Sequence, residues 1–523
     1  MLEWFKTLRC CIERLGDSAG LDWRLTRNRM KKLNVLTGAS IVTALFLCPV
    51  SGVMAQGQAS ASSSSGGGGT IQVSQPPGMN DPSFQGSVPT GTASSTPIPL
   101  SLGEAIDRGL KTNLGLLTTE QSSSEVRAQR LRALAGLLPK VTGQLSMTEQ
   151  QLNLQALGFN LKLPASAGFQ IPTIVPPYSY QAALINANVP VFDYSAINTF
   201  RASREQQKVA ALSVKNARDL VTVGVGNAYL IIIADAARIT ATQAQIDADN
   251  AVFTNATRRH DAGTAIGIDV LRSQVELKQR QQQLVAVQNQ YDKDKLSLGR
   301  IIGLPVGQDF SVTDPSPNVP LEAMSLKDAL DKAYDHRPDY QAAKAKVSAA
   351  QFTLRSSRAE RYPTGTLTGY YGDEGLRLFT NSHGVFNLTG SVNFNIFDGG
   401  RIKADIVQNN AELTNRRNEM ENLRGQIDFD VRSSLLDLKS ASDQVDVAKS
   451  NLQLAQQSLQ QSRDRFTAGV TNTVEVVQAQ QTLAQANENL ISAEYQYNVA
   501  KVELSRALGL AEEGLRTYFS KNP

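Results

Sequence analysis

The chain of 523 residues carries 52 basic and 48 acidic side chains, and 41% of its residues are hydrophobic. Its three cysteines and both tryptophans lie within the first 48 positions. A leader over residues 1–55 would remove them all and leave 44 basic and 44 acidic residues, which excludes disulfides, a thiol nucleophile and a generally basic nucleic-acid-binding surface.

Residues 30–55 have the pattern of a signal peptide. Met30-Lys31-Lys32 supplies positive charge, a mostly apolar stretch follows to Leu47, and Val53-Met54-Ala55 places small residues at a cleavage position. The apolar stretch is too short to cross a bilayer as a helix. We therefore predict export, with the mature chain starting near Gln56.

The segments around this signal are harder to place. Residues 1–29 match neither of the repeats described below, so they are either a long leader or the result of a start codon placed too far upstream; the second interpretation is favoured. Cys48 raises the alternative of a lipoprotein, but Leu47 before it is too bulky for a lipobox. Residues 56–99 are Ser, Gly or Pro at 24 of 44 positions, with Asp81 as the only charge. This composition predicts a disordered segment.

We predict that the ordered part of the chain begins at Leu100 with short helices. Ser101-Leu102-Gly103-Glu104 has the pattern of a capping box, and Ser325-Leu326-Lys327-Asp328 is its partner 224 residues later. In both places a second helix follows and ends at a proline, after Leu138 in one copy and after Tyr362 in the other.

Beyond each proline the apolar period changes from 3.6 to 2 residues, which predicts strands. Four strands are expected, at about 140–150, 181–192, 364–371 and 388–397, with loops over 151–179 and 372–387. Each strand has an apolar face and an uncharged polar face. A half-buried soluble sheet is the alternative, but four such strands in two hairpins of an exported chain favour membrane-spanning strands around a wet lumen.

Long helices follow the strand pairs. Helices are predicted at about 194–261 and 400–466, and return helices at about 269–302 and 474–508. From Met420 to Leu459 apolar residues recur roughly every 3.5 residues, which indicates a narrow helical seam. A helix of this length spans about 100 Å and needs neighbours throughout. We expect the return helix to cover one half and the shorter helix before the strands to cover the other.

The whole block occurs twice. Phe192-Asp193 corresponds to Phe397-Asp398 at an offset of 205, and Ala262-Gly263 corresponds to Ala468-Gly469 at an offset of 206. Asp398 is expected to cap the second long helix, and Gly469 to take a left-handed conformation in the turn. The predicted organisation is repeat 1 over 100–304, a linker over 305–324, repeat 2 over 325–510, and a C-terminal tail over 511–523.

Four strands cannot enclose a channel, because even eight leave an interior filled by side chains. An open sheet edge cannot face lipid either. Several copies must therefore share one barrel, and three copies supply twelve strands. The expected fold class is an α+β membrane protein, a homotrimer with a 12-stranded β-barrel on an α-helical barrel.

These features resemble the TolC-like outer-membrane efflux protein family, whose members are trimeric channels of tripartite efflux pumps and type I secretion systems. The resemblance covers about residues 100–510 and rests on the two repeats, the strand hairpins after the prolines, and the Phe-Asp, Ala-Gly and Leu-Gly positions. It implies an exit channel for small molecules or secreted proteins in the outer membrane of a Gram-negative bacterium. It also implies that the helical barrel lies in the periplasm, with a closed tip and with a mixed equatorial region that contains the linker over 305–324. It further implies contact with outer-membrane lipid and two partners: a periplasmic adaptor and, through the adaptor, an inner-membrane transporter.

The resemblance also assigns residues near the tip. In the family, acidic residues after the second Ala-Gly turn ring the aperture, and the matching positions are Glu475 and Gln478, so one ring is kept and one is neutral. Glu475 also suits a helix N-terminus as a carboxylate favoured by the dipole, and both roles are compatible. Asp269 matches an acid that contacts a Tyr and an Arg. Those positions are Phe466 and Thr471 here, which lack the hydroxyl and the guanidinium.

The turns themselves are the predicted docking points for the adaptor. They are the places where the long helices reverse, and they lie farthest from the strands. The residues assigned to this role are Gly263, Thr264, Gly469 and Val470.

Two other function classes compete with a channel. An enzyme is disfavoured because the chain after the leader has three histidines (His260, His336 and His383), no cysteine, no glycine-rich phosphate loop and no metal-ligand cluster. We therefore expect no catalytic residue, no metal, no other cofactor and no nucleic-acid partner. A periplasmic coiled-coil adaptor without a membrane barrel is the alternative, but it would lack the four amphipathic strands.

Overall fold

The computed structural model describes residues 82–154, 156, 158, 174–264, 266–314, 324–378, 380–471 and 473–519. The predicted leader, the signal peptide with its cleavage position, and residues 56–81 lie outside these ranges.

The helices occur as two sets of nearly equal lengths. The first set is α2 (Leu102–Thr112), α3 (Leu114–Ala135), α4 (Tyr194–Asp261) and α5 (Gly267–Ile301). The second set is α6 (Leu326–His336), α7 (Pro338–Ala359), α8 (Arg401–Thr467) and α9 (Thr473–Ala507). Corresponding helices have 11 and 11, 22 and 22, 68 and 67, and 35 and 35 residues. Such agreement is what a duplicated block requires.

Side-chain caps fix where the helices begin. Ser101 and Glu104 form the reciprocal capping box that the sequence predicted at the start of α2. At the start of α8, the Asp398 carboxylate accepts hydrogen bonds from the backbone N–H groups of Gly400 at 2.9 Å and Ile402 at 2.8 Å. These bonds favour the ionised form and lower the pKa of Asp398. The predicted cap is thus confirmed.

The strands form an antiparallel sheet in the order β2-β3-β5-β6, namely β2 (Lys140–Asn153), β3 (Ile174–Phe192), β5 (Thr364–Arg377) and β6 (Asn381–Asn393). The register aligns the predicted apolar positions, because Val141 lies opposite Ala187, Ala187 opposite Gly369, and Gly369 opposite Leu388. One face is therefore apolar across all four strands. Its side chains are exposed in the single chain, with Leu145 at 80%.

Both hairpins are longer than the sequence indicated. β2 continues to Asn153 and β3 starts at Ile174, so the predicted loop over 151–179 is too long at both ends. β5 continues to Arg377 and β6 starts at Asn381, so the predicted loop over 372–387 is wrong. Glu374 pairs with His383 in this extension. The ladder continues through polar residues, and a pattern of apolar alternation cannot detect that part of a strand.

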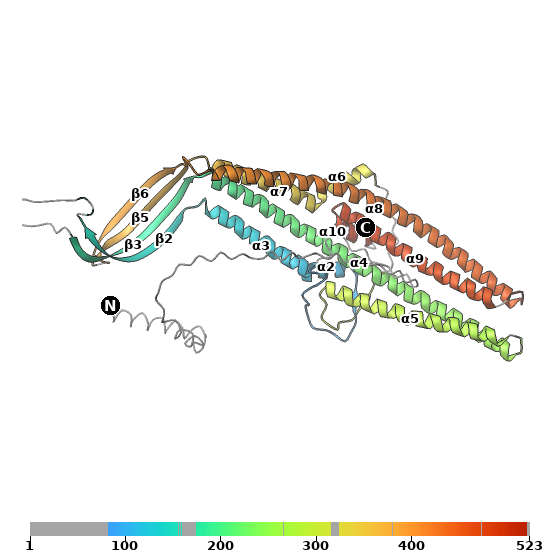
Figure 1. The fold of residues 1–523 in the computed structure, drawn as a ribbon. Coiled ribbons are helices and arrows are strands. Elements are labelled where there is room, and N and C mark those ends of the chain that lie inside the picture. Colours follow the sequence, from blue (N-terminus) through green and yellow to red (C-terminus); the bar gives the residue numbers. More distant parts are fainter. Residues whose placement is uncertain are drawn as a thin grey trace, which may run out of the picture. The chain divides into compact units, whose positions relative to one another are not determined.

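Helices α4 and α8 each contact different helices along the two halves of their length (Figure 1). On the half nearer the sheet, α4 contacts α3 and α7, and α8 contacts α7. On the other half, α4 contacts α5 and α9, and α8 contacts α9. The expected arrangement, in which the short helix covers the half that the return helix leaves free, is observed.

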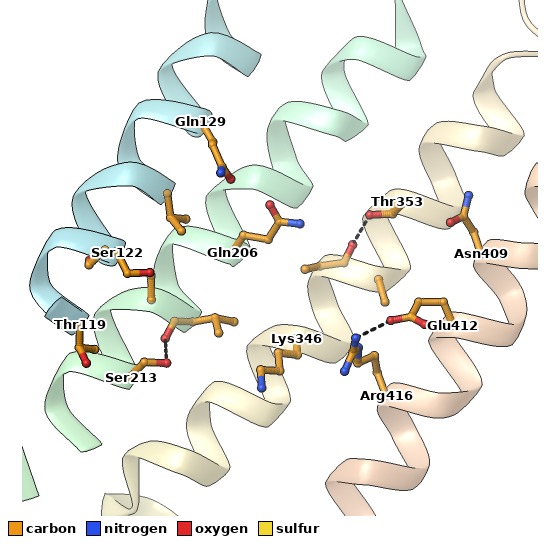
Figure 2. A pocket seen from close by; sticks show the side chains of 16 residues that line it. Thr119, Ser122, Gln129, Gln206, Ser213, Lys346, Thr353, Asn409, Glu412 and Arg416 are labelled. Atoms are coloured by element: carbon orange, nitrogen blue, oxygen red, sulfur yellow. Dashed lines mark hydrogen bonds and ion pairs between the residues drawn. The ribbon is translucent and has the colours of Figure 1, made fainter. Parts of the chain in front are cut away.

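A groove of about 690 Å³ crosses α3, α4, α7 and α8 (Figure 2). Its lining mixes small apolar residues with Ser, Thr, Gln and Asn, and it holds three charged residues, Lys346, Glu412 and Arg416. Arg416 forms ion pairs of 2.7 Å with Glu412 and with Glu419 on the same helix. This part of the helical layer therefore presents a hollowed face that water can wet.

The segment before α2 is ordered where the structure describes it. β1 (Ile98–Leu100) pairs in parallel with β4 (Phe310–Val312), and Ser87 forms an isolated bridge with Asn113. The prediction of disorder over 56–99 is therefore wrong for residues 82–99. β1 gains its order from a strand more than 200 residues away, which local composition cannot reveal.

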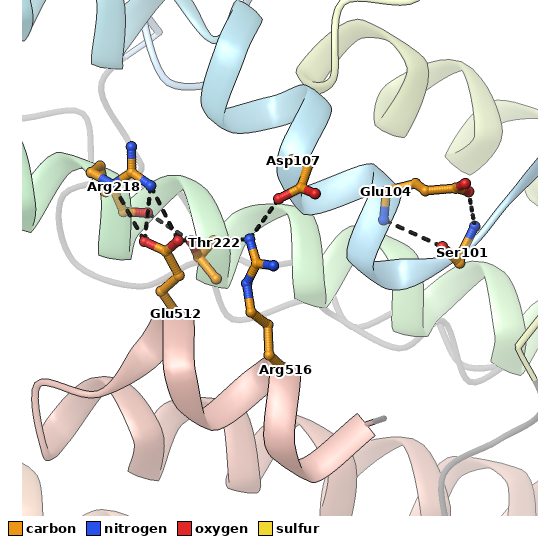
Figure 3. Close-up of polar contacts among 7 residues, drawn as sticks. All are labelled: Ser101, Glu104, Asp107, Arg218, Thr222, Glu512 and Arg516. Carbon is orange, nitrogen blue, oxygen red and sulfur yellow. Dashed lines mark hydrogen bonds and ion pairs between the residues drawn. The ribbon is translucent and has the colours of Figure 1, made fainter. Parts of the chain in front are cut away.

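The predicted C-terminal tail contains a further helix, α10 (Ala511–Phe519), which lies against α4 and α9. Figure 3 shows its polar contacts: Glu512 binds Arg218 of α4, with a shortest ion-pair distance of 3.1 Å, and Arg516 binds Asp107 of α2. Leu515 is fully buried beneath them. The C-terminal tail is thus held against helices of repeat 1.

An apolar segment in α4 provides the largest core. Among the described helices, α4 alone has an 18-residue window of mean hydropathy 1.7, and 72% of that window is buried inside the protein. Val221, Val225, Tyr229 and Ile232 are fully buried there, against residues of α2, α5, α9 and α10. The Tyr229 hydroxyl donates a hydrogen bond of 2.9 Å to the Leu100 carbonyl. The segment is therefore the interior of the helical part.

Candidate functional site at the helix turns

The two turns that end α4 and α8 have the same backbone geometry and lie at the same end of the helices, opposite the sheet (Figure 1). Gly263 has φ +75° and Gly469 has φ +72°, so the predicted left-handed glycine is confirmed. After each glycine, one N–H closes the helix end: Thr264 donates to the Arg259 carbonyl at 2.8 Å, and Val470 donates to the Arg465 carbonyl at 2.9 Å. The four residues predicted for docking thus form two matching exposed caps.

A cleft of about 340 Å³ lies between the two turns. It is lined by Ala256, Arg259, Gly263, Thr264, Ile266, Asp269, Phe466, Thr471 and Thr473. The structure therefore brings Asp269 close to Phe466 and Thr471, the three positions that the family resemblance relates.

The contacts made inside the cleft differ from those that the resemblance describes. The Arg259 guanidinium carbon lies 4.7 Å from the centre of the Phe466 ring and so joins the two hairpins by a cation–π contact. Asp269 lies 3.9 Å from Arg272, one turn further along α5. Phe466 thus contacts a cation from the neighbouring hairpin, at the position for which the resemblance implies a tyrosine.

Glu475 lies in the first turn of α9 and is held on both carboxylate oxygens. The Thr471 hydroxyl donates to one oxygen, and the Arg465 Nε atom lies 3.5 Å from the other. The side chain of Glu475 is 38% exposed and that of Arg465 is 58% exposed. Gln478 is exposed one turn later. The sequence placed Glu475 correctly near a helix N-terminus but did not identify its arginine partner.

Polar and apolar contacts join the two hairpins above the turns. Arg238 of α4 forms an ion pair of 2.8 Å with Glu488 of α9, and the Gln481 side chain donates a hydrogen bond of 3.1 Å to Glu276 of α5. Nearer the turns, Val252 packs against an apolar cluster of α8 and α9. These contacts hold together the two hairpins of one chain.

In the part of the chain that the structure describes, no group of three or more His, Cys, Asp or Glu side chains is arranged to hold a metal ion. The chemistry available at the turns is therefore that of single charges and hydrogen bonds at an exposed helical end.

Comparison with known proteins adds a family and a fold. The family described as outer membrane efflux protein matches residues 105–304 and 329–510. The pyoverdine export outer membrane protein OpmQ of Pseudomonas aeruginosa is 25% identical over 419 residues, which cover 78% of this chain and 85% of OpmQ. The toluene efflux pump outer membrane protein TtgF of Pseudomonas putida is 24% identical over 412 residues, which cover 78% of this chain and 82% of TtgF.

Solved structures share the fold. The outer membrane protein VceC of Vibrio cholerae has a TM-score of 0.67 at 17% identity, with 78% of this chain and 96% of VceC covered. The CmeC outer membrane channel of Campylobacter jejuni has a TM-score of 0.67 at 16% identity, with 82% of this chain and 92% of CmeC covered.

Proposed function

Because the chain belongs to the outer membrane efflux protein family and is thus an efflux channel of the outer membrane, we propose that three copies form its pore. Each copy would contribute four strands to a 12-stranded barrel and its helices to a periplasmic barrel. The alternative of an adaptor without a membrane barrel is not favoured, because the family match covers most of both repeats and all of each strand hairpin.

The observation that carries this proposal is the sheet. β2 and β6 each have one edge that pairs with no other strand of the described chain, and the apolar face is exposed. Lipid can cover the apolar face, but it cannot satisfy backbone N–H and C=O groups at the two edges. Pairing β6 of one copy with β2 of the next removes both edges and closes the sheet.

The helical layer supports the same arrangement. α8 lies at one side of the layer and carries a stripe of exposed apolar residues, namely Val407, Phe429, Leu436, Val447 and Leu454. Their spacings of 22, 7, 11 and 7 residues keep them on one face of the helix. α5 lies at the other side with its own stripe, namely Leu271, Val275, Val285 and Leu296. Head-to-tail packing of α8 against α3 and α5 of the next copy buries these stripes and generates a ring.

The groove over α3, α4, α7 and α8 would then face the lumen. Its hollowed, wettable lining suits the inside of a helical barrel better than a helix–helix contact. Named relatives export pyoverdine or toluene, and on that basis we propose small molecules as cargo, with secreted proteins as the second candidate.

The turns at Gly263–Thr264 and Gly469–Val470 are the proposed docking points for a periplasmic adaptor, which would link the channel to an inner-membrane transporter. The support is their position at the end farthest from the sheet and the matching geometry of the two caps. Two similar caps per copy give a trimer six similar docking points.

Glu475 is the proposed aperture residue, with Asp269 near it and Gln478 as the neutral second position. Three Glu475 carboxylates at a constriction would favour cations and attract polyvalent cation blockers, because a charged constriction focuses potential. Glu475→Gln should lower cation selectivity in planar bilayers and leave the trimer intact, and Gln478→Glu should strengthen the block. Unchanged selectivity and block in Glu475→Gln would mean that Glu475 is only a helix-end charge.

A further inference from the structure

The two turns carry the same charge pattern at equivalent positions. Arg259 and Asp269 flank the first turn, and Arg465 and Glu475 flank the second, and the members of each pair are ten positions apart. The pairs are 206 residues apart, the same offset that relates the two Ala-Gly turns. Duplication has therefore placed an arginine on the incoming helix and an acid on the outgoing helix of both hairpins.

The two pairs do not make the same contacts. In the second hairpin the pair is closed, with Arg465 Nε at 3.5 Å from Glu475. In the first hairpin the arginine has turned away, since Arg259 lies over the Phe466 ring of the other hairpin and Asp269 lies beside Arg272 at 3.9 Å. The equivalent of Phe466 in the first hairpin is His260, so only one hairpin offers this aromatic ring.

We propose that Arg465 is a selectivity-determining residue of the aperture, because it is the counter-charge of Glu475. The proposal rests on the proposed position of Glu475 at the constriction. Three copies give a ring in which arginine and glutamate alternate, so the fields of the two charges partly cancel. The channel is then only weakly cation-selective, and its selectivity depends on the arginine as much as on the acid.

The test uses the full-length protein in planar bilayers under a KCl gradient, with the reversal potential as the readout. Arg465→Gln should raise the ratio of K⁺ to Cl⁻ permeability by roughly two- to fivefold, the range expected for a partly exposed charge pair. It should also strengthen block by the trivalent cation hexamminecobalt. Glu475→Gln should lower the ratio, and the double variant should return close to the wild type. Arg465→Lys should keep the wild-type ratio.

Arg259→Gln is the matched control. It removes the same charge from the equivalent position of the first hairpin, where the arginine contacts Phe466 instead of an aperture acid. It should change the permeability ratio less than Arg465→Gln does. Each variant is first checked as a trimer in detergent.

The outcomes separate the proposal from its premise. Equal effects of Arg465→Gln and Arg259→Gln would show that net tip charge, not the pair, sets selectivity, and the proposal would fail. An effect of Glu475→Gln with none from Arg465→Gln would also defeat it while leaving the aperture at Glu475. Both variants could form trimers that conduct with the wild-type ratio of K⁺ to Cl⁻ permeability. In that case the constriction lies elsewhere, and the proposed role of Glu475 fails as well.

Discussion

The Leu515 side chain of α10 packs directly on Gly226 of α4, so closely that a methyl group at Gly226 would lie 2.6 Å from Leu515 Cδ2. Leu515 is fully buried. Leu515→Ala should therefore leave a cavity and lower the free energy of unfolding by about 2–4 kcal/mol per protomer. Thermal unfolding in detergent measures this.

Arg516→Ala is the control for that change. Its ion pair with Asp107 joins two side chains that are each about half exposed, so its loss should cost less than about 1 kcal/mol. Equal losses from both variants would mean that α10 is held by its polar contacts and not by the leucine.

A second prediction concerns pH. Burial, together with the nearby Glu512 carboxylate, raises the pKa of Asp219 to about 7 from its ordinary value of 3.8. Between these values the folded chain binds more protons than the unfolded chain, so this group makes stability fall as pH rises from about 4 to 7. Asp219→Asn should remove that part of the pH dependence and exceed the wild type in melting temperature at pH 8.

Asp261→Asn is the matched control, because the Asp261 side chain is exposed. This variant should keep the wild-type dependence of melting temperature on pH. Asp219→Asn could instead change the melting temperature by the same amount at all pH values. That result would contradict a raised pKa of Asp219 as the cause of this part of the pH dependence.

Assembly gives a third prediction. One edge of β2 and one edge of β6 pair with no other strand in the described ranges, and we expect other copies to pair them, so the purified protein should be a detergent-stable or SDS-resistant trimer. Light scattering with correction for bound detergent measures the protein mass. A monodisperse monomer in mild detergent with an intact β signal by circular dichroism would rule out the shared barrel.

Docking gives a fourth prediction. A photo-crosslinker at Val470, which is 70% exposed in the second turn, should capture an adaptor in cells. The control is Val306, which is 92% exposed next to α5 but far from the turns. Crosslinks to an adaptor from Val306 and not from Val470 would place docking at the equatorial region.

The sequence predicted the features that depend on local periodicity. Alternation at Val141 and Leu145 predicted the apolar face of the sheet, and the carboxylate of Asp398 predicted a helix start. Spacing about a helix turn also carries information on contacts. The Arg465–Glu475 pair could have been found by noting that both residues lie five positions from the centre of the same turn.

Contacts between distant segments were beyond such reasoning. β1 pairs with β4, and Leu515 packs on Gly226, which lies almost 300 residues earlier. Neither contact could be inferred from the residues nearby in the sequence. The cleft at the turns also depends on how the two hairpins approach each other, which places Arg259 over Phe466.

We propose that trimers of this chain enclose one continuous pore that narrows at the helix turns. Single-channel recording in planar bilayers tests it when the intact protein is compared with a variant that lacks residues 253–275 and 459–481. These segments are centred on the two turns, and short glycine-serine turns replace them. We expect small, rare conductance steps from the intact protein and larger, stable steps from the shortened trimer. A shortened trimer that inserts into the bilayer and conducts no better than the intact protein would contradict the claim.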